Sequence, residues 1–156
     1  MSERAAIALG SNIENPEAQV RRAFEEIAEL PGTRLIARSR LHRTRPVGYA
    51  DQPDFVNAMV LVETSLEPRP LLEALLEIEK MHGRVRTIPN GPRSLDLDII
   101  LYGDRVIAEP GLTVPHPRAK DRDFVMVPLR EVWPGVVIPD AHKGNDPGSG
   151  STRGSA

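Results

Sequence analysis

The sequence predicts an α+β fold, in which an antiparallel β-sheet carries its helices on one face. Two stretches, Phe55–Thr64 and Leu95–Leu101, alternate with the period of two that a strand with one buried face shows. Two others, beginning at Pro16 and Pro70, repeat apolar residues every three or four positions, as amphipathic helices do. With two further apolar runs, the order is strand, helix, strand, strand, helix, strand. This order is typical of the ferredoxin-like split βαβ sandwich.

The first half of the chain contains a strand, a helix and a second strand. Ala5–Leu9 is a short apolar run that a glycine follows, which indicates a buried strand. At the start of the helix, Asn15 can cap the free N–H groups and Pro16 suits the first helical position. Pro31–Gly32 ends this helix, and Thr33–His42 is expected to form the next strand.

The second half begins with a loop over Arg43–Asp54, which is long for a connection without a functional role. The strand Phe55–Thr64 places Phe55, Asn57, Met59 and Leu61 on the face opposite Val56, Ala58, Val60 and Val62. A second helix is expected over Pro70–His82, and a second loop over Arg84–Asn90. Two short elements are expected later in the chain: a strand at Asp104–Ile107 and a helix at Asp123–Leu129.

Composition limits the possible partners. The chain has 156 residues, which suits a single domain, and its net charge of −2 gives no general basic surface, so we expect no nucleic-acid partner. It contains no cysteine, which excludes disulfides, a thiolate zinc site and a thiol nucleophile. The N-terminus lacks an apolar signal core and no apolar run reaches about 18 residues. We therefore expect a cytoplasmic protein without membrane contact.

The most informative stretch is Gly91–Gly103, whose strand carries Asp96 and Asp98 two positions apart. Residues i and i+2 of a strand point to the same side, with Cα atoms about 6.5–7 Å apart. Two carboxylates this close favour a bound cation, and Mg²⁺ typically takes one or two carboxylates together with phosphates and waters. Three arginines that can bind phosphate precede the pair: Arg84, Arg86 and Arg93. Taken alone, the acids could equally be the solvated face of a strand.

A second set of candidates combines aromatic and polar side chains. Asn57 shares a strand face with Phe55, so its amide could bind the polar edge of a flat heterocycle on which the ring stacks. His116 lies between two prolines, and Arg122 and Phe124 follow it. Each of these residues has an ordinary structural interpretation as well, as a core aromatic, a cross-strand amide or a surface charge.

Together these residues resemble the 6-hydroxymethyl-7,8-dihydropterin pyrophosphokinase family. The segment GPRSLDLDI is the most specific part of the resemblance, which extends over nearly the whole chain, to about Pro139. The motifs that carry it are Ala5–Asn12, Arg43–Thr44, Asp51–Ala58, Gly83–Arg86, Gly91–Asp98 and Leu112–His116.

The resemblance implies a folate-pathway enzyme that transfers diphosphate from ATP to the pterin hydroxymethyl group and releases AMP. It implies two Mg²⁺ ions, bound by Asp96 and Asp98. The expected pterin-binding residues are Thr44, Val47, Phe55, Asn57 and Phe124. The expected ATP-binding residues are Glu79, Arg84, Arg86, Arg93, Ile99, His116 and Arg122. The expected catalytic residues are Arg84, Arg93, Asp96 and Asp98.

The resemblance also shapes the expected organisation. Residues 1–140 would form the pyrophosphokinase domain and 141–156 a disordered tail rich in Gly and Ser; we expect a monomer. The arginine loop would close over ATP. Asn90, Pro117 and Leu76 depart from residues that some relatives carry near the nucleotide, so the resemblance leaves those contacts open.

The sequence allows three other interpretations. Another metal-dependent nucleotide transferase could use the same acid pair without aromatics around an amide. A ligand-binding module on the same fold would have lost the chemistry, which the presence of both acids and all three arginines disfavours. A ferredoxin-like nucleic-acid-binding domain usually has aromatics on its open sheet face and a basic charge balance.

Overall fold

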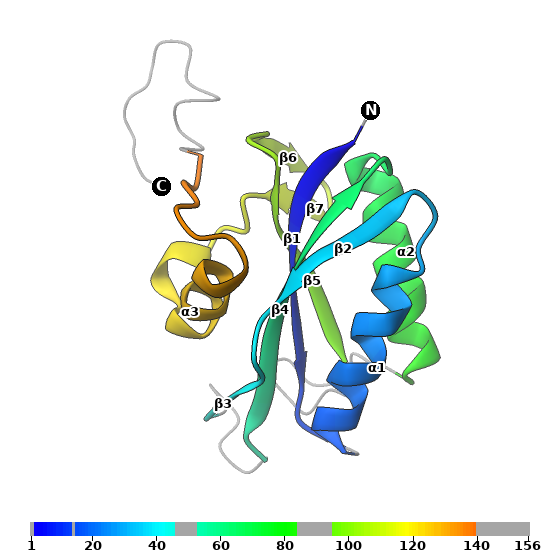
Figure 1. Ribbon diagram of the computed structural model, residues 1–156, viewed down its shortest axis with the longest axis vertical. Coiled ribbons are helices and arrows are strands. Elements are labelled where there is room, and N and C mark those ends of the chain that lie inside the picture. Colours follow the sequence, from blue (N-terminus) through cyan, green and yellow to red (C-terminus); the bar gives the residue numbers. More distant parts are fainter. Residues whose placement is uncertain (1, 14, 46–52, 84–94, 140–156) are drawn as a thin grey trace.

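The computed structural model describes residues 2–13, 15–45, 53–83 and 95–139, which form three layers (Figure 1). The middle layer is an antiparallel sheet of five strands: β1 (Glu3–Ser11), β2 (Thr33–Arg38), β3 (His42–Thr44), β4 (Phe55–Thr64) and β5 (Asp96–Tyr102). A separate hairpin joins β6 (Ile107–Glu109) and β7 (Leu112–Val114). The helices are α1 (Pro16–Ala28), α2 (Pro68–Met81) and α3 (Asp123–Val132), and a 3₁₀ turn at Ala119–Asp121 precedes α3.

The long strands lie in the order β2-β4-β1-β5, and every neighbouring pair is antiparallel. The short β3 pairs with the first residues of β4, beyond the end of β2. Near the end of β1, Gly10 lies between Asn57 of β4 and Asp96 of β5. The expected α+β class with an antiparallel sheet is confirmed, and its register brings an amide and a carboxylate to either side of one glycine.

Both faces of the sheet are covered. Helices α1 and α2 pack on the face that includes Ile7, Leu9 and Val60, as expected. Helix α3 packs on the opposite face, where Leu129 contacts the cluster that contains Met59 and Leu61 (Figure 1). The expectation of helices on one face is therefore wrong for α3. Because α3 covers only part of its face, a depression remains between its first turn and the strand ends.

Strand β5 departs from strict alternation. Leu97 and Ile99 face the α1–α2 core, as expected, but Leu101 faces the α3 core together with Ile100. The cause is a shift in the β1–β5 register, in which Ile100 is the additional residue on β5. The Ile100 carbonyl accepts a hydrogen bond of 3.0 Å from the backbone N–H of His116.

Several expected boundaries need correction. The strand expected at Thr33–His42 is divided into β2 and β3, so Arg43 and Thr44 belong to a strand rather than to a loop. Asn15 has a left-handed backbone (φ 62°) and makes no side-chain cap, although its carbonyl accepts the first helical hydrogen bond, from Gln19.

The two short elements and the second helix also differ from expectation. The strand expected at Asp104–Ile107 is replaced by the β6–β7 hairpin, whereas α3 extends the expected short helix to Val132. Helix α2 begins at Pro68, two residues earlier than expected. Among the described helices, none is long and apolar enough to cross a bilayer. The expected tail, 141–156, lies outside the described residues.

Candidate active site

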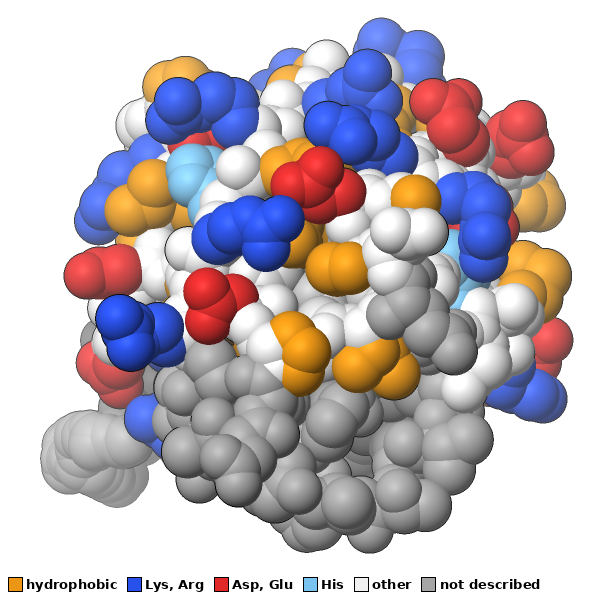
Figure 2. Space-filling model, turned by 90° about the horizontal axis from the view of Figure 1, so that it is seen from below, with side chains coloured by type: hydrophobic (Ala, Val, Ile, Leu, Met, Phe, Trp, Pro, Cys, Tyr) orange, Lys and Arg blue, Asp and Glu red, His pale blue; other side chains and the backbone are white. Residues whose placement is uncertain are grey.

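A cavity of about 380 Å³ lies on the α3 face of the sheet, where β1 ends and β4 and β5 begin. These strand ends are at the lower end of the molecule in Figure 1. Seen from there, acidic and basic side chains lie close together around apolar ones (Figure 2). The cavity brings together eight residues that the sequence analysis selected: Thr44, Phe55, Asn57, Asp96, Asp98, His116, Arg122 and Phe124.

The acid pair lies on one wall of this cavity. Asp96 and Asp98 lie opposite Gly10 and Ala8 of β1, and both line the cavity, as the alternation predicted. Within the described part of the chain, no group of three or more histidine or acidic side chains could hold a metal ion by itself. Two carboxylates on one side of a strand suit Mg²⁺, which commonly completes its octahedron with phosphate and water oxygens.

Behind the acids, the edge of the sheet is held by a buried carboxylate. Because β5 is an edge strand, its outward N–H groups need partners from outside the sheet. The Oε2 atom of Glu79, a residue of α2 that is 3% exposed, accepts a hydrogen bond of 2.8 Å from the N–H of Leu97, the residue between the two aspartates. Glu79 is not among the residues that line the cavity, and the Ile99 side chain lies in the α1–α2 core.

The amide wall is built by three strands. Asn57 donates from Nδ2 to the Thr44 Oγ1 atom at 2.6 Å, a contact between β4 and β3. On its other side, a Cβ atom at Gly10 would lie 3.2 Å from the Asn57 Oδ1 atom, so only glycine leaves this amide its space. Phe55 begins β4 and Phe124 lies in the first turn of α3, so two aromatic side chains from different layers face one cavity.

The third wall is cationic. The Nδ1 atom of His116 accepts a hydrogen bond of 3.3 Å from the N–H of Arg118, so the neutral ring carries its proton on Nε2. Burial lowers the pKa of His116 below its usual 6.5, the Arg122 and Arg118 charges lower it further, and Asp96 opposes them. The Arg122 guanidinium also lies 5.4 Å from the centre of the Phe124 ring.

The cavity contains residues that the sequence analysis missed. Arg45 and Arg118 add two guanidinium groups, and Gly10 allows the close approach of β1 to Asn57. Arg118 is four residues before Arg122 in a short turn, a spacing that could have placed both on one side. Four expected site residues lie outside the described part of the chain: Val47, Arg84, Arg86 and Arg93. The loop expected to close over ATP also lies there.

A family model described as 7,8-dihydro-6-hydroxymethylpterin-pyrophosphokinase matches residues 6–134. The chain belongs to this family. The expected family and its diphosphokinase step in folate biosynthesis are thereby confirmed.

Curated relatives are similar in sequence to most of this chain. A 2-amino-4-hydroxy-6-hydroxymethyldihydropteridine pyrophosphokinase of Pseudomonas aeruginosa is 45% identical over 140 residues, which are 90% of this chain and 86% of the relative. The protein of that name from Haemophilus influenzae is 44% identical over 137 residues, which are 88% of this chain and 86% of the relative. The folic acid synthesis protein fol1 of Schizosaccharomyces pombe is 40% identical over 89% of this chain, but only 19% of that relative is covered.

Proposed function

We propose that the described cavity is the site at which this pterin pyrophosphokinase transfers diphosphate from ATP to the hydroxymethyl oxygen of 6-hydroxymethyl-7,8-dihydropterin. One observation supports the proposal most strongly: a carboxylate pair, an imidazole and an amide line one cavity together with two aromatic rings, although they come from four separate segments. Each of the three groups suits a different part of the reaction. The acids suit metal ions, the imidazole suits phosphate, and the amide suits the pterin.

At the metal end, Asp96 and Asp98 would hold Mg²⁺, and the family resemblance gives two ions. Bound Mg²⁺ would neutralise phosphate charge and orient the diphosphate. Glu79 would support the acids from behind by fixing the Leu97 peptide between them. The Ile99 side chain points away from the cavity into the core, so its expected contact with ATP would have to come from its backbone.

At the nucleotide end, the neutral ring of His116 would donate from Nε2 to a phosphate oxygen. Arg122 would add charge on the same side, as would Arg118, and the resemblance adds Arg84, Arg86 and Arg93. Positively charged groups fixed beforehand around a transferring phosphoryl group lower the barrier, because the charge that develops needs little reorganisation.

At the pterin end, the edge of the heterocycle would pair with the Asn57 amide, while its faces would contact Phe55 and Phe124. Thr44 would hold that amide in place through its 2.6 Å bond, and the resemblance adds Val47. The hydroxymethyl oxygen would form a bond to the β-phosphorus as the bond from that phosphorus to the α,β-bridging oxygen breaks. AMP would leave, and Asp98 would accept the hydroxyl proton late in the step.

Three finer features belong to the same proposal. The strand order β2-β4-β1-β5, with α1 and α2 as crossovers on one face, supports the ferredoxin-like arrangement. Residues 1–140 would be the catalytic unit. We also propose a monomer that works in the cytoplasm on small-molecule substrates, without a macromolecular partner.

The test is an assay with ATP, Mg²⁺ and the hydroxymethyldihydropterin, in which AMP rather than ADP should appear. Asp96→Asn and Asp98→Asn should each lower kcat at least about 100-fold, the scale of removing one group that stabilises a transition state. Asp104→Asn is the matched control, because Asp104 is exposed beyond the end of β5 and outside the cavity. Release of ADP, or full turnover of Asp98→Asn at saturating Mg²⁺, would contradict the proposal.

A further inference from the structure

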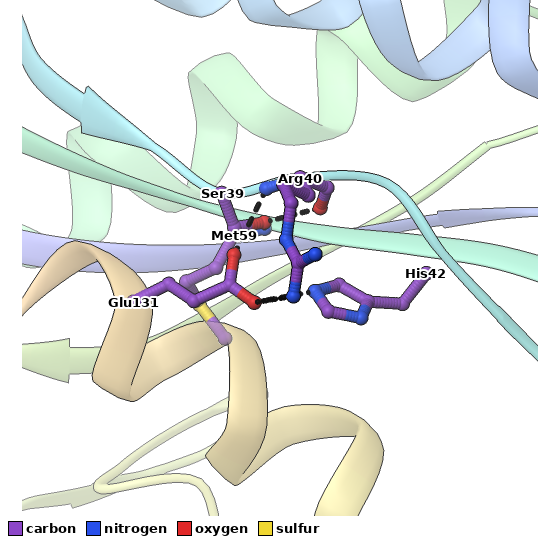
Figure 3. A network of polar contacts seen from close by, with 5 residues as sticks. All are labelled: Ser39, Arg40, His42, Met59 and Glu131. Atoms are coloured by element: carbon purple, nitrogen blue, oxygen red, sulfur yellow. Dashed lines mark hydrogen bonds and ion pairs between the residues drawn. The ribbon is translucent and has the colours of Figure 1, made fainter.

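Outside the cavity, one carboxylate of α3 holds the connection between β2 and β3 (Figure 3). Glu131 accepts a hydrogen bond of 2.9 Å from the Arg40 backbone N–H at Oε1, and its Oε2 atom lies 3.5 Å from the Arg40 Nη2 atom. The same Oε2 atom lies 2.8 Å from the His42 Nε2 atom. Arg40 lies just before β3, and His42 is the first residue of that strand.

The His42 ring lies directly against the same carboxylate. Its Nε2 atom is buried and has no partner in hydrogen-bond geometry, although the Glu131 oxygen is 2.8 Å away. Burial alone would raise the pKa of Glu131, but the Arg40 N–H and the His42 and Arg40 charges outweigh it, so this pKa lies below its usual 4.5. The carboxylate is therefore ionised at neutral pH and attracts the Arg40 guanidinium.

The same connection is fixed to the centre of the sheet. Ser39 and Met59 of β4 exchange two hydrogen bonds of 2.9 Å, one between their backbones and one from the Met59 N–H to the Ser39 Oγ atom. The Ser39 hydroxyl also donates to the Arg40 carbonyl at 2.7 Å. The connection is thus held by β4 at Ser39 and by α3 at Arg40 and His42. Strand β3 starts at His42.

This arrangement couples the two ends of the amide wall. In β3, His42 is the register partner of Asn57. Two residues further on, Thr44 accepts the Asn57 hydrogen bond, and both residues line the cavity. Helix α3 has Phe124 at its start and Glu131 near its end. Glu131 therefore ties the helix that supplies one aromatic side chain to the strand that holds the amide.

We propose that Glu131 is a positioning residue for the pterin, which sets the separation between Phe124 on α3 and the Thr44–Asn57 pair on β3 and β4. The inference rests on the proposed location of the pterin in this cavity. Glu131 itself is not among the cavity-lining residues, so it would act only through the elements that it joins. Removing it should loosen the pterin half of the cavity and leave the half made by β5 and His116 unchanged.

The experiment measures two dissociation constants by calorimetry. The first is that of a non-hydrolysable ATP analogue with Mg²⁺. The second is that of the pterin, measured while the protein is saturated with this analogue and Mg²⁺. Glu131→Ala should weaken pterin binding about tenfold and change nucleotide binding less than twofold. Glu131→Gln keeps an acceptor for the Arg40 N–H but loses the charge, so it should weaken the pterin about threefold. At saturating substrates, kcat should stay within about threefold for both variants.

Glu63→Ala is the matched control. Glu63 makes a 2.6 Å ion pair with Arg34, but it lies six residues along β4 from Asn57, about 20 Å away. It should leave both dissociation constants unchanged. An unchanged pterin constant in Glu131→Ala, or an equal loss for both ligands, would overturn the inference. If Asn57→Ala also left pterin binding unchanged, the proposed pterin location would be wrong, and the coupling through Glu131 would fall with it.

Discussion

The Asn57 side chain donates a 2.6 Å hydrogen bond from Nδ2 to the Thr44 Oγ1 atom, and this bond holds the amide of β4 against β3 at the cavity. The Oδ1 atom is oriented toward Gly10, where a Cβ atom would come within 3.2 Å. Thr44 thus holds the amide in position beside the cavity, and recognition of a heterocycle depends on that position.

Loss of the amide should mainly affect pterin binding. We expect Asn57→Ala to weaken the pterin roughly 10- to 100-fold, because a buried hydrogen-bonding group of the ligand would lose its partner at about 1–3 kcal/mol. Thr44→Val should have a smaller effect of the same kind, since the amide remains but loses the hydrogen bond that holds it. Calorimetry with saturating nucleotide measures both changes, and a larger effect of Thr44→Val than of Asn57→Ala would argue against this hierarchy.

The small space beside Asn57 gives a second prediction. Gly10→Ala would place a methyl group 3.2 Å from Oδ1, closer than such contacts usually are, so the amide has to shift by a few tenths of an ångström. We expect KM for the pterin to rise several-fold and KM for ATP to stay unchanged. Thermal unfolding gives the control measurement, because a methyl that simply disrupted β1 would lower the melting temperature as well.

Much of this arrangement follows from local patterns in the sequence. The alternation in β4 correctly placed Val56 and Asn57 on opposite faces, and that in the first half of β5 placed both aspartates on the cavity side. Such patterns report the period of a strand, which is a local property. They could not reveal the additional residue at Ile100, because a bulge depends on how β5 pairs with β1.

Local sequence patterns also could not predict the short strand β3 or the buried hydrogen bond of Glu79. Strand β3 has only three residues and exists because β4 lies beside it, so Arg43 and Thr44 were expected in a loop. Glu79 was selected through the family resemblance, but its bond to the Leu97 N–H joins residues 18 positions apart in sequence and reflects tertiary packing. Arg118 enters the cavity through the turn before α3, whose path the sequence pattern does not define.

The buried Glu79 should contribute to both stability and metal binding. Glu79→Ala leaves the Leu97 N–H without its acceptor, which costs about 1–3 kcal/mol and should lower the melting temperature by several degrees. The Mg²⁺ concentration for half-maximal activity should rise, because the peptide between the aspartates is no longer held. Glu79→Gln keeps an oxygen acceptor and should show smaller changes; equal losses in both variants would mean that the charge, and not this hydrogen bond, matters.

The lowered pKa of His116 predicts a dependence of stability on pH. A histidine whose pKa is lower in the folded than in the unfolded state stabilises the fold above the unfolded value, and this stability is lost as the pH falls. Below about pH 6.5, the wild type should therefore lose stability faster than His116→Asn. Chemical denaturation at a series of pH values measures this difference, and NMR titration of the ring checks it directly; parallel stability curves would contradict the prediction.

The hydrogen bond from the His116 N–H to the Ile100 carbonyl has a mechanical consequence. The two acids belong to β5, and His116 is hydrogen-bonded to the same strand. There β5 is paired with β1 on one side and hydrogen-bonded to Glu79 on the other. When α3, β2 or β3 moves relative to the rest of the sheet, these three groups should move together as a rigid unit. Pterins of different size would then widen or narrow the pterin half of the cavity, while the distances between His116, Asp96 and Asp98 at the phosphate end stay constant.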